Sequence, residues 1–190
     1  MTNAQNKKHC IIIHWCPSDD TDPTYNKHWM PWVKKSLEDQ NFRVDTPAMP
    51  NPRLPVYEDY KEVFDQLEVN EDTVLVWHSC WCAFLVRWLW ESKQKVQKLI
   101  LVAPWKVNDE WDDYREKFYT FDIDKTISDR VSEIVMFTAD NEDQDGKDSL
   151  KMYHHILWWE IIDIASYGHY TIGGMWTEDF PELISILVGS

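Results

Sequence analysis

The stretch Thr73-Val74-Leu75-Val76-Trp77-His78-Ser79-Cys80-Trp81-Cys82 is an apolar run that leads directly into a serine and then into a helix-like segment. A serine between a buried strand and a helix sits on a sharp turn that exposes its hydroxyl, the arrangement called a nucleophile elbow. The residues two before and two after that serine are normally small, because strand and helix cross closely there. Both positions hold tryptophan here. The stretch therefore predicts a nucleophilic Ser79 with unusual flanks.

Apolar runs alternate with helical patterns along the whole chain, which is typical of βαβ units and a parallel sheet. Several runs are apolar throughout, as strands buried on both faces are. The expected strands are 10–14, 42–45, 73–77, 98–103, 133–138 and 160–164, and the expected helices are 28–40, 57–67, 82–92, 150–158 and 177–188. The sequence thus predicts an α/β fold, a single three-layer domain over residues 1–190 with a mostly parallel sheet of about six strands.

Two segments are expected to lack regular structure. Residues 47–52 contain three prolines in six positions and predict a loop. Residues 106–129 are acidic and aromatic without a clean period. We expect this second segment to form a cap over the ends of the strands.

The charge balance excludes several classes of partner. Acidic residues number 33 against 19 basic ones, giving a net charge of -14, and lysine and arginine do not cluster. Attraction to nucleic acid or to an anionic membrane surface is therefore not expected. The first eight residues are polar, unlike a signal peptide, and no later run approaches the roughly 18 apolar residues of a membrane span. We expect a cytoplasmic protein.

The four cysteines, at positions 10, 16, 80 and 82, lack the paired spacing of a zinc ribbon. Reduced thiols are the expected state in a cytosolic chain. A metal site remains a minor alternative, and its donors would be His14, Cys16, His78, Cys80 and Cys82. A thiol enzyme is disfavoured because neither Cys80 nor Cys82 occupies the apex of the predicted elbow.

A nucleophilic serine needs a base to take its proton, an acid to orient that base, and donors for the oxyanion. The acidic cluster Asp140-Asn141-Glu142-Asp143 follows the fifth expected strand, and Gly168-His169 follows the sixth. The order serine, acid, histidine is that of α/β-hydrolases, and all three would lie beyond the carboxyl ends of parallel strands. We therefore expect Ser79 as nucleophile and His169 as base. His78 precedes the serine, should point away from it, and is expected to be structural.

The oxyanion donors are expected to be backbone N–H groups. His14-Trp15-Cys16-Pro17 follows the first expected strand, where these folds place a turn that contributes one such donor. The candidates are the N–H of Cys80 and that of Trp15 or Cys16. This chemistry requires no metal and no organic cofactor.

Several segments distributed over residues 8–188 jointly resemble one known family. They are Ile11-Ile12-Ile13-His14, His28-Trp29-Met30-Pro31-Trp32, Met49-Pro50-Asn51-Pro52, His78-Ser79, Leu101-Val102-Ala103-Pro104, Phe118-Tyr119-Thr120-Phe121-Asp122, Gly168-His169 and Phe180-Pro181-Glu182-Leu183. The pattern is similar to that of the small YdeN-like serine hydrolases, which include the retinoblastoma-binding serine hydrolase.

The resemblance implies a compact α/β-hydrolase that cleaves small ester or amide acyl substrates through an acyl-enzyme intermediate, with Ser79 as nucleophile and His169 as base. The family's acid position falls on Glu142, whereas a one-residue shift of the alignment gives Asp143, and Asp140 ranks third. The family's retinoblastoma-binding motif, L-x-C-x-E, does not occur in this chain. That partner is therefore not carried over.

The chain departs from the family mainly at glycine positions, since Trp15, Trp77 and Trp81 stand where the family has glycine. Trp90 and one of Trp158 or Trp159 also fall where glycine is common near a helix end. Five glycines are few against the usual roughly 7%, while twelve tryptophans are many. The tryptophan excess therefore lies at positions that call for glycine.

Two explanations follow. In the first, the backbone has moved to accept the rings, since overpacking a tight crossing costs about 1 to 3 kcal/mol or more; the chain would then be an impaired hydrolase-fold binding protein whose elbow is blocked by Trp77 and Trp81. In the second, which we favour, the gene uses UGA for glycine and was translated with UGA as tryptophan. The codons decide between them, because UGG at positions 15, 77 and 81 would exclude the second.

Overall fold

The computed structural model describes residues 7–14, 16–17, 26–107 and 115–189 of the chain. Six strands form one parallel sheet in the order β2-β1-β3-β4-β5-β6. The strands are β1 (His9–Ile13), β2 (Arg43–Asp45), β3 (Thr73–His78), β4 (Val96–Val102), β5 (Val131–Thr138) and β6 (Glu160–Asp163). The predicted α/β fold with a parallel sheet is confirmed.

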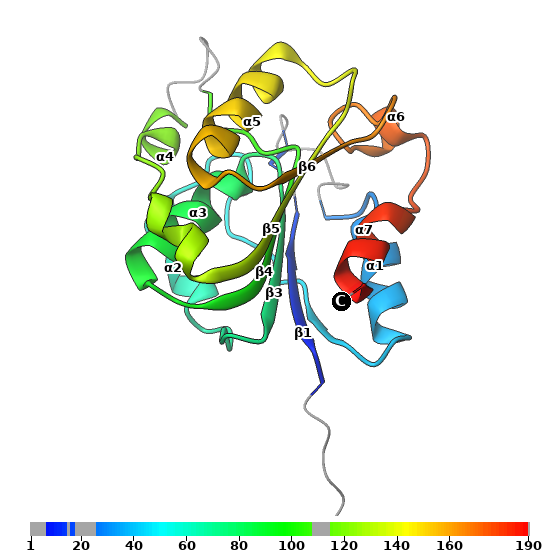
Figure 1. Ribbon diagram of the computed structural model, residues 1–190, viewed down its shortest axis with the longest axis horizontal. Helices are drawn as coiled ribbons and strands as arrows, with labels where there is room; N and C mark the ends of the chain where they lie inside the picture. The colour runs from blue at the N-terminus through cyan, green and yellow to red at the C-terminus, as the bar shows by residue number, and fades with distance from the viewer. Residues whose placement is uncertain (1–6, 15, 18–25, 108–114, 190) are drawn as a thin grey trace, which may run out of the picture.

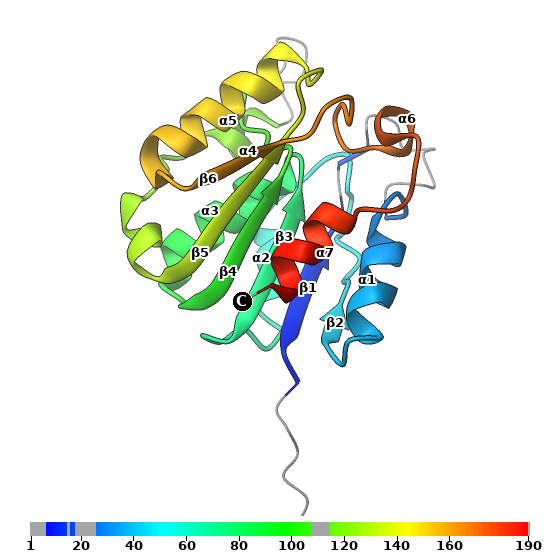
Figure 2. The same cartoon turned by 45° about the vertical axis from the view of Figure 1, so that its right-hand side comes forward.

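Helices lie on both faces of this sheet, as Figures 1 and 2 show. They are α1 (Met30–Glu38), α2 (Tyr57–Phe64), α3 (Trp81–Ser92), α4 (Glu116–Tyr119), α5 (Gln144–Leu157), α6 (Ile172–Met175) and α7 (Pro181–Val188), with a 3-10 turn, η1, over Lys125–Asp129. Helices α1 and α7 pack together on one face, while α2, α3 and α5 cover the other. The molecule therefore has the three predicted layers.

Because side chains alternate along a strand, each central strand contributes to two separate cores. In β3, Val74 and Val76 pack with the α1 and α7 side chains, whereas Leu75 and Trp77 pack with those of α2 and α3. All four residues are at most 1% exposed. This alternation places Trp77 in the core beneath α2 and α3.

The register aligns the carboxyl ends of the strands at one edge of the sheet. His78 pairs with Val102, Val102 with Phe137, and Thr138 with Asp163. The segments that follow β3, β5 and β6 consequently begin close together. These are the segments that carry Ser79, the acidic cluster and His169.

Several predicted helix boundaries were wrong. The helix predicted over 150–158 begins at Gln144, and the one predicted over 177–188 begins at Pro181. The first turns of α5 are almost entirely polar, so apolar periodicity becomes visible only from Leu150. The short helix α6 was not predicted, and the 106–129 segment contains α4 and η1 within its described part.

Two tryptophans end helices in the left-handed backbone conformation that favours glycine. Trp158 closes α5 with φ of 54°, and Trp176 closes α6 with φ of 57°. Trp158 thus occupies a glycine-favouring position, as predicted. The same prediction for Trp90 was wrong, because this residue lies inside α3 and Lys93 takes the left-handed position.

We expect Trp158→Gly and Trp176→Gly each to stabilise the protein by about 1 kcal/mol, because a left-handed non-glycine residue costs roughly 1 to 2 kcal/mol. Their side chains are 74% and 86% exposed, so little packing is lost. Thermal unfolding should show midpoints raised by roughly 2 to 4 °C. Trp90→Gly is the matched control and should lower the midpoint, since glycine weakens a helix interior by about 1 kcal/mol. Equal shifts for all three variants would contradict the backbone argument.

Candidate active site

Ser79 lies on the turn between β3 and α3 in a strained conformation. Its φ is 60°, a value that non-glycine residues adopt rarely and that nucleophile elbows use. The Ser79 N–H donates to the Val102 carbonyl at 2.9 Å, and the Ser79 carbonyl accepts from Cys82 and Trp105 N–H groups at 3.1 and 3.2 Å. These bonds to the next strand, β4, and to the loop that follows it hold the turn in place.

His169 lies in the segment after β6, and its ring reaches the serine. The Nε2 atom is 2.7 Å from Ser79 Oγ, within hydrogen-bond distance. Trp105 packs edge-on against the imidazole with ring centroids 5.3 Å apart. The two residues expected to form the nucleophile and base pair are therefore in direct contact.

Glu142 contacts the opposite side of the His169 ring. Its Oε2 is 2.9 Å from His169 Nδ1, and its Oε1 accepts the Asp143 backbone N–H at 2.9 Å. A carboxylate at Nδ1 holds the proton on that nitrogen and leaves Nε2 free to accept the serine proton. Gly146 leaves room for the Glu142 side chain in this position, because a Cβ on residue 146 would lie 2.8 Å from Glu142 Cγ.

The other two acid candidates have different positions. Asp143 directly precedes α5 and lines the cavity beside Ser79 without a bond to His169 among the described contacts. Asp140 accepts the Ser166 backbone N–H at 2.7 Å. Of the three carboxylates, the structure brings Glu142 to the histidine.

The Cys80 backbone lies at the start of the twelve-residue helix α3, where N–H groups point out of the helix and its dipole favours negative charge. Cys16, which follows β1, lines the same cavity, and its thiol donates to the Pro52 carbonyl at 2.7 Å. Trp15, the remaining oxyanion candidate, lies outside the described residues. The N-terminus of α3 thus places partial positive charge in the cavity beside Ser79.

An open cavity of about 400 Å³ leads to the serine. Its lining residues are Cys16, Ser79, Cys80, Trp105, Arg115, Tyr119, Asp143, His169 and Thr171. No role at the site was predicted for Arg115, Tyr119 and Thr171. Arg115 and Thr171 lie in no motif, whereas Tyr119 belongs to the family-like segment Phe118-Tyr119-Thr120-Phe121-Asp122, which was the available signal. The Arg115 guanidinium donates to the Arg53 carbonyl at 3.0 Å, which fixes it at the cavity wall.

The two elbow tryptophans do not separate the serine from the histidine. Trp77 stacks on Phe84 with centroids 5.1 Å apart, and Trp81 lies 3.9 Å from the Tyr60 ring, both fully buried in the core under α2 and α3. Neither indole N–H has a hydrogen-bond partner among the described residues. The two indole rings therefore occupy the core and not the space between Ser79 and His169. This placement argues against the blocked-elbow alternative.

The cysteines offer little support for thiol or metal chemistry. All four are buried and free, and burial raises the pKa of the Cys80 and Cys82 thiols well above the usual range. Their thiolate forms are correspondingly disfavoured. Within the described ranges, no group of three or more His, Cys, Asp or Glu side chains is arranged to hold a metal ion.

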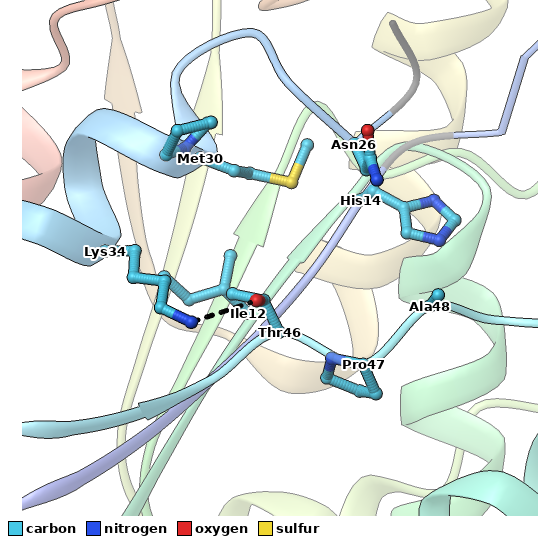
Figure 3. Close-up of a pocket in the computed structure, with 9 residues that line it drawn as sticks. Ile12, His14, Asn26, Met30, Lys34, Thr46, Pro47 and Ala48 are labelled. Atoms are coloured by element: carbon cyan, nitrogen blue, oxygen red, sulfur yellow. Dashed lines mark hydrogen bonds between the residues drawn. The ribbon is translucent and has the colours of Figure 1, made fainter. Parts of the chain in front are cut away.

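A second cavity, of about 140 Å³, lies between β1, α1 and the segment that follows β2 (Figure 3). Neither Ser79 nor His169 lines it. Its polar groups are His14, Asn26, Lys34 and Thr46, and its walls are Ile12, Met30, Pro31, Pro47 and Ala48. Lys34 donates to Thr46 across one side at 3.4 Å. His14 also packs edge-on against Trp81, with centroids 5.5 Å apart.

No helix in the described part of the chain is long and apolar enough to cross a membrane. The fold and the Ser-His contact together define an α/β-hydrolase. The sequence profile of the family described as serine hydrolase matches residues 19–178, a range that contains Ser79, Glu142 and His169. The chain therefore belongs to the serine hydrolase family, and its relatives below place it with the YdeN-like members.

A curated relative is YdeN of Bacillus subtilis (strain 168), whose name assigns it to the hydrolases. It is 33% identical over 100 residues, which is half of this chain and half of YdeN. The crystal structure of the ydeN gene product from B. subtilis has a TM-score of 0.78 at 21% identity, covering 96% of this chain and 97% of that one.

Two esterases have the same fold at lower identity. Est1E from Butyrivibrio proteoclasticus, bound to ferulic acid, has a TM-score of 0.64 at 12% identity and covers 98% of this chain and 88% of its own. The carboxylesterase CesB from Bacillus subtilis has a TM-score of 0.57 at 12% identity, with 98% and 85% covered. At such identities the likeness concerns the fold.

Proposed function

We propose that the protein is a carboxylesterase-like hydrolase of small ester or amide substrates, with Ser79 as nucleophile, His169 as general base and Glu142 as the orienting acid. The observation that carries this proposal is the continuous relay of 2.7 Å from Ser79 Oγ to His169 and 2.9 Å from His169 to Glu142. Ser79 and His169 both line the cavity of about 400 Å³, so a substrate carbonyl in the cavity has access to the serine.

In acylation, Ser79 Oγ attacks the carbonyl carbon while His169 Nε2 takes the hydroxyl proton. Glu142 stabilises the imidazolium that forms, and the developing oxyanion accepts hydrogen bonds from the backbone N–H groups of Cys80 and of Cys16 or Trp15. His169 then gives its proton to the leaving alcohol or amine. An acyl group remains on the Ser79 oxygen.

Deacylation repeats these steps with water. His169 Nε2 takes a proton from the water, the hydroxide oxygen adds to the acyl carbon, and Ser79 leaves with the proton that His169 returns. The product is a carboxylic acid. No step requires a metal or an organic cofactor.

The cavity also indicates which substrates fit. Trp105, which follows β4, and Tyr119, in α4, give it an aromatic wall. A volume of about 400 Å³ accommodates an acyl group of modest size. The net charge of -14 disfavours polyanionic substrates such as nucleic acid.

A series of p-nitrophenyl esters from acetate to dodecanoate tests the proposal. We expect hydrolysis of the short esters with a kcat/KM that falls for acyl chains too long for the cavity, and an initial burst of nitrophenol that reports acyl-enzyme formation. The matched amides should react more slowly because nitroaniline is a poorer leaving group. Hydrolysis no faster than that of Ser79→Ala for every ester would contradict the proposal.

A further inference from the structure

His169 lies in a segment without helix or strand, between the end of β6 at Asp163 and the start of α6 at Ile172. Ser166, Gly168 and Tyr170 have positive φ values of 63°, 53° and 56°. Helical or strand hydrogen bonding does not run through this described segment, in which the Tyr170 N–H closes one turn to the Tyr167 carbonyl at 3.0 Å. The position of the His169 ring therefore depends on contacts from neighbouring loops.

Two of these contacts come from the outer ends of the segment. Asp140 Oδ1 accepts the Ser166 N–H at 2.7 Å, and the Tyr170 hydroxyl donates to the Thr138 carbonyl at 2.6 Å. They attach the segment to the end of β5 and the loop after it. Within the segment the Tyr170 N–H donates to the Tyr167 carbonyl at 3.0 Å, whereas the His169 carbonyl and the Gly168 N–H are bound by residues of other loops.

The His169 carbonyl and the N–H of the preceding residue, Gly168, are bound by side chains from the other triad loops. His78 Nε2 lies 2.8 Å from the His169 carbonyl oxygen, and Asn141 Oδ1 accepts the Gly168 N–H at 2.8 Å. His78 directly precedes Ser79, and Asn141 directly precedes Glu142. The two loops that contact the His169 ring thus also bind the backbone at His169 and at the residue before it.

A neutral His78 ring suits the donation of a hydrogen bond to the His169 carbonyl. The residue is fully buried, and burial together with the neighbouring His169 holds its pKa well below the usual range. Its ring lies 5.4 Å from that of His169. A neutral ring can donate Nε2–H to the carbonyl without placing a second positive charge beside the imidazolium that forms in catalysis.

We propose that His78 and Asn141 are positioning residues that hold the His169 backbone so that its Nε2 meets Ser79 Oγ. This inference rests on the proposed function, because it concerns the same reaction. A purely structural role would reduce the amount of folded protein. A positioning role reduces the turnover of each folded, titratable site.

The test compares variants that remove one donor or acceptor with variants that keep it. His78→Phe keeps a ring without an N–H, whereas His78→Gln keeps a donor near the Nε2 position. Asn141→Leu removes the acceptor, and Asn141→Asp keeps it. The turnover number of each variant is measured with p-nitrophenyl acetate and divided by the sites that a fluorophosphonate labels at completion.

We expect His78→Phe and Asn141→Leu to lower kcat per labelled site by about 10- to 100-fold with little change in KM, since small misplacements of a catalytic group have effects of this size. His78→Gln and Asn141→Asp should recover most of that loss. Unchanged kcat per site in His78→Phe, or equal losses in His78→Phe and His78→Gln, would overturn the positioning role.

Wild type and Ser79→Ala are included in the same assay. If wild-type protein is no faster than Ser79→Ala, the proposed function fails, and the positioning role, which rests on it, fails with it. If wild type is active and the four variants match it, only the positioning role fails. The two failures are therefore distinguishable.

Discussion

Replacing Ser79 by alanine is expected to lower kcat/KM for a short p-nitrophenyl ester by on the order of 10⁴ or more, because a triad without its nucleophile retains only binding and oxyanion stabilisation. The hydroxyl is the only part of the side chain removed, and it lies 2.7 Å from His169 Nε2. Initial rates over a range of ester concentrations measure the loss.

Ser185→Ala is the matched control. This serine is exposed on α7, and its hydroxyl donates to the Pro181 carbonyl within the same helix. The control should keep wild-type kcat/KM. A Ser79→Ala protein that is folded and loses less than about ten-fold would contradict the nucleophile assignment.

Replacing Glu142 by glutamine is expected to lower kcat by about 10³- to 10⁴-fold, the effect seen when the orienting carboxylate of a triad becomes an amide. The side chain is 2% exposed and directly bonded to His169 Nδ1. The amide keeps its size and removes the charge that stabilises the imidazolium. Steady-state kinetics with the same ester measures the change in kcat.

Asp143→Asn separates the two acid candidates. Asp143 lines the cavity and has no bond to His169 among the described contacts, so we expect its amide to lower kcat by less than ten-fold. Larger loss in Asp143→Asn than in Glu142→Gln would reverse the assignment. Circular dichroism of both variants shows whether they are folded to the same extent.

The sheet and two members of the proposed triad were accessible from sequence for physical reasons. Buried parallel strands are continuous apolar runs, so the runs before Ser79 and before the acidic cluster were recognisable. The strand before His169, β6, is a mostly exposed edge strand and was recognisable only from its short apolar stretch. Chain order then placed all three at one edge of the sheet. These features depend on local composition and on topology, both of which a sequence displays.

The family resemblance placed Glu142 first among the acids, with Asp143 and Asp140 behind it, but the contact that distinguishes them depends on packing that a sequence does not display. Glu142 points at His169 because Gly146 leaves room for its side chain and because α5 already begins at Gln144. The polar first turns of α5 gave no periodic signal, so this helix start was missed. The roles of Arg115 and Thr171 at the cavity were missed for the same reason, since only the folded loops bring them to Ser79.

The predictions about the tryptophans were partly right and partly wrong. One of Trp158 or Trp159 was predicted at a glycine-favouring helix end, and Trp158 does have a left-handed backbone there; Trp176, which was not predicted, has one as well. The alternative in which Trp77 and Trp81 block the elbow does not match the structure, because both rings pack in the core. Their indole N–H groups have no hydrogen-bond partner among the described residues. Unsatisfied buried donors cost about 1 to 3 kcal/mol each.

Covalent labelling by a fluorophosphonate, followed by peptide mass spectrometry, decides whether Ser79 is the nucleophile. We expect one adduct per chain, on Ser79, and none in Ser79→Ala. We also expect slower labelling of Glu142→Gln at the same residue, because His169 is then poorly oriented. An adduct on another residue, or equal labelling of wild type and Ser79→Ala, would contradict the account.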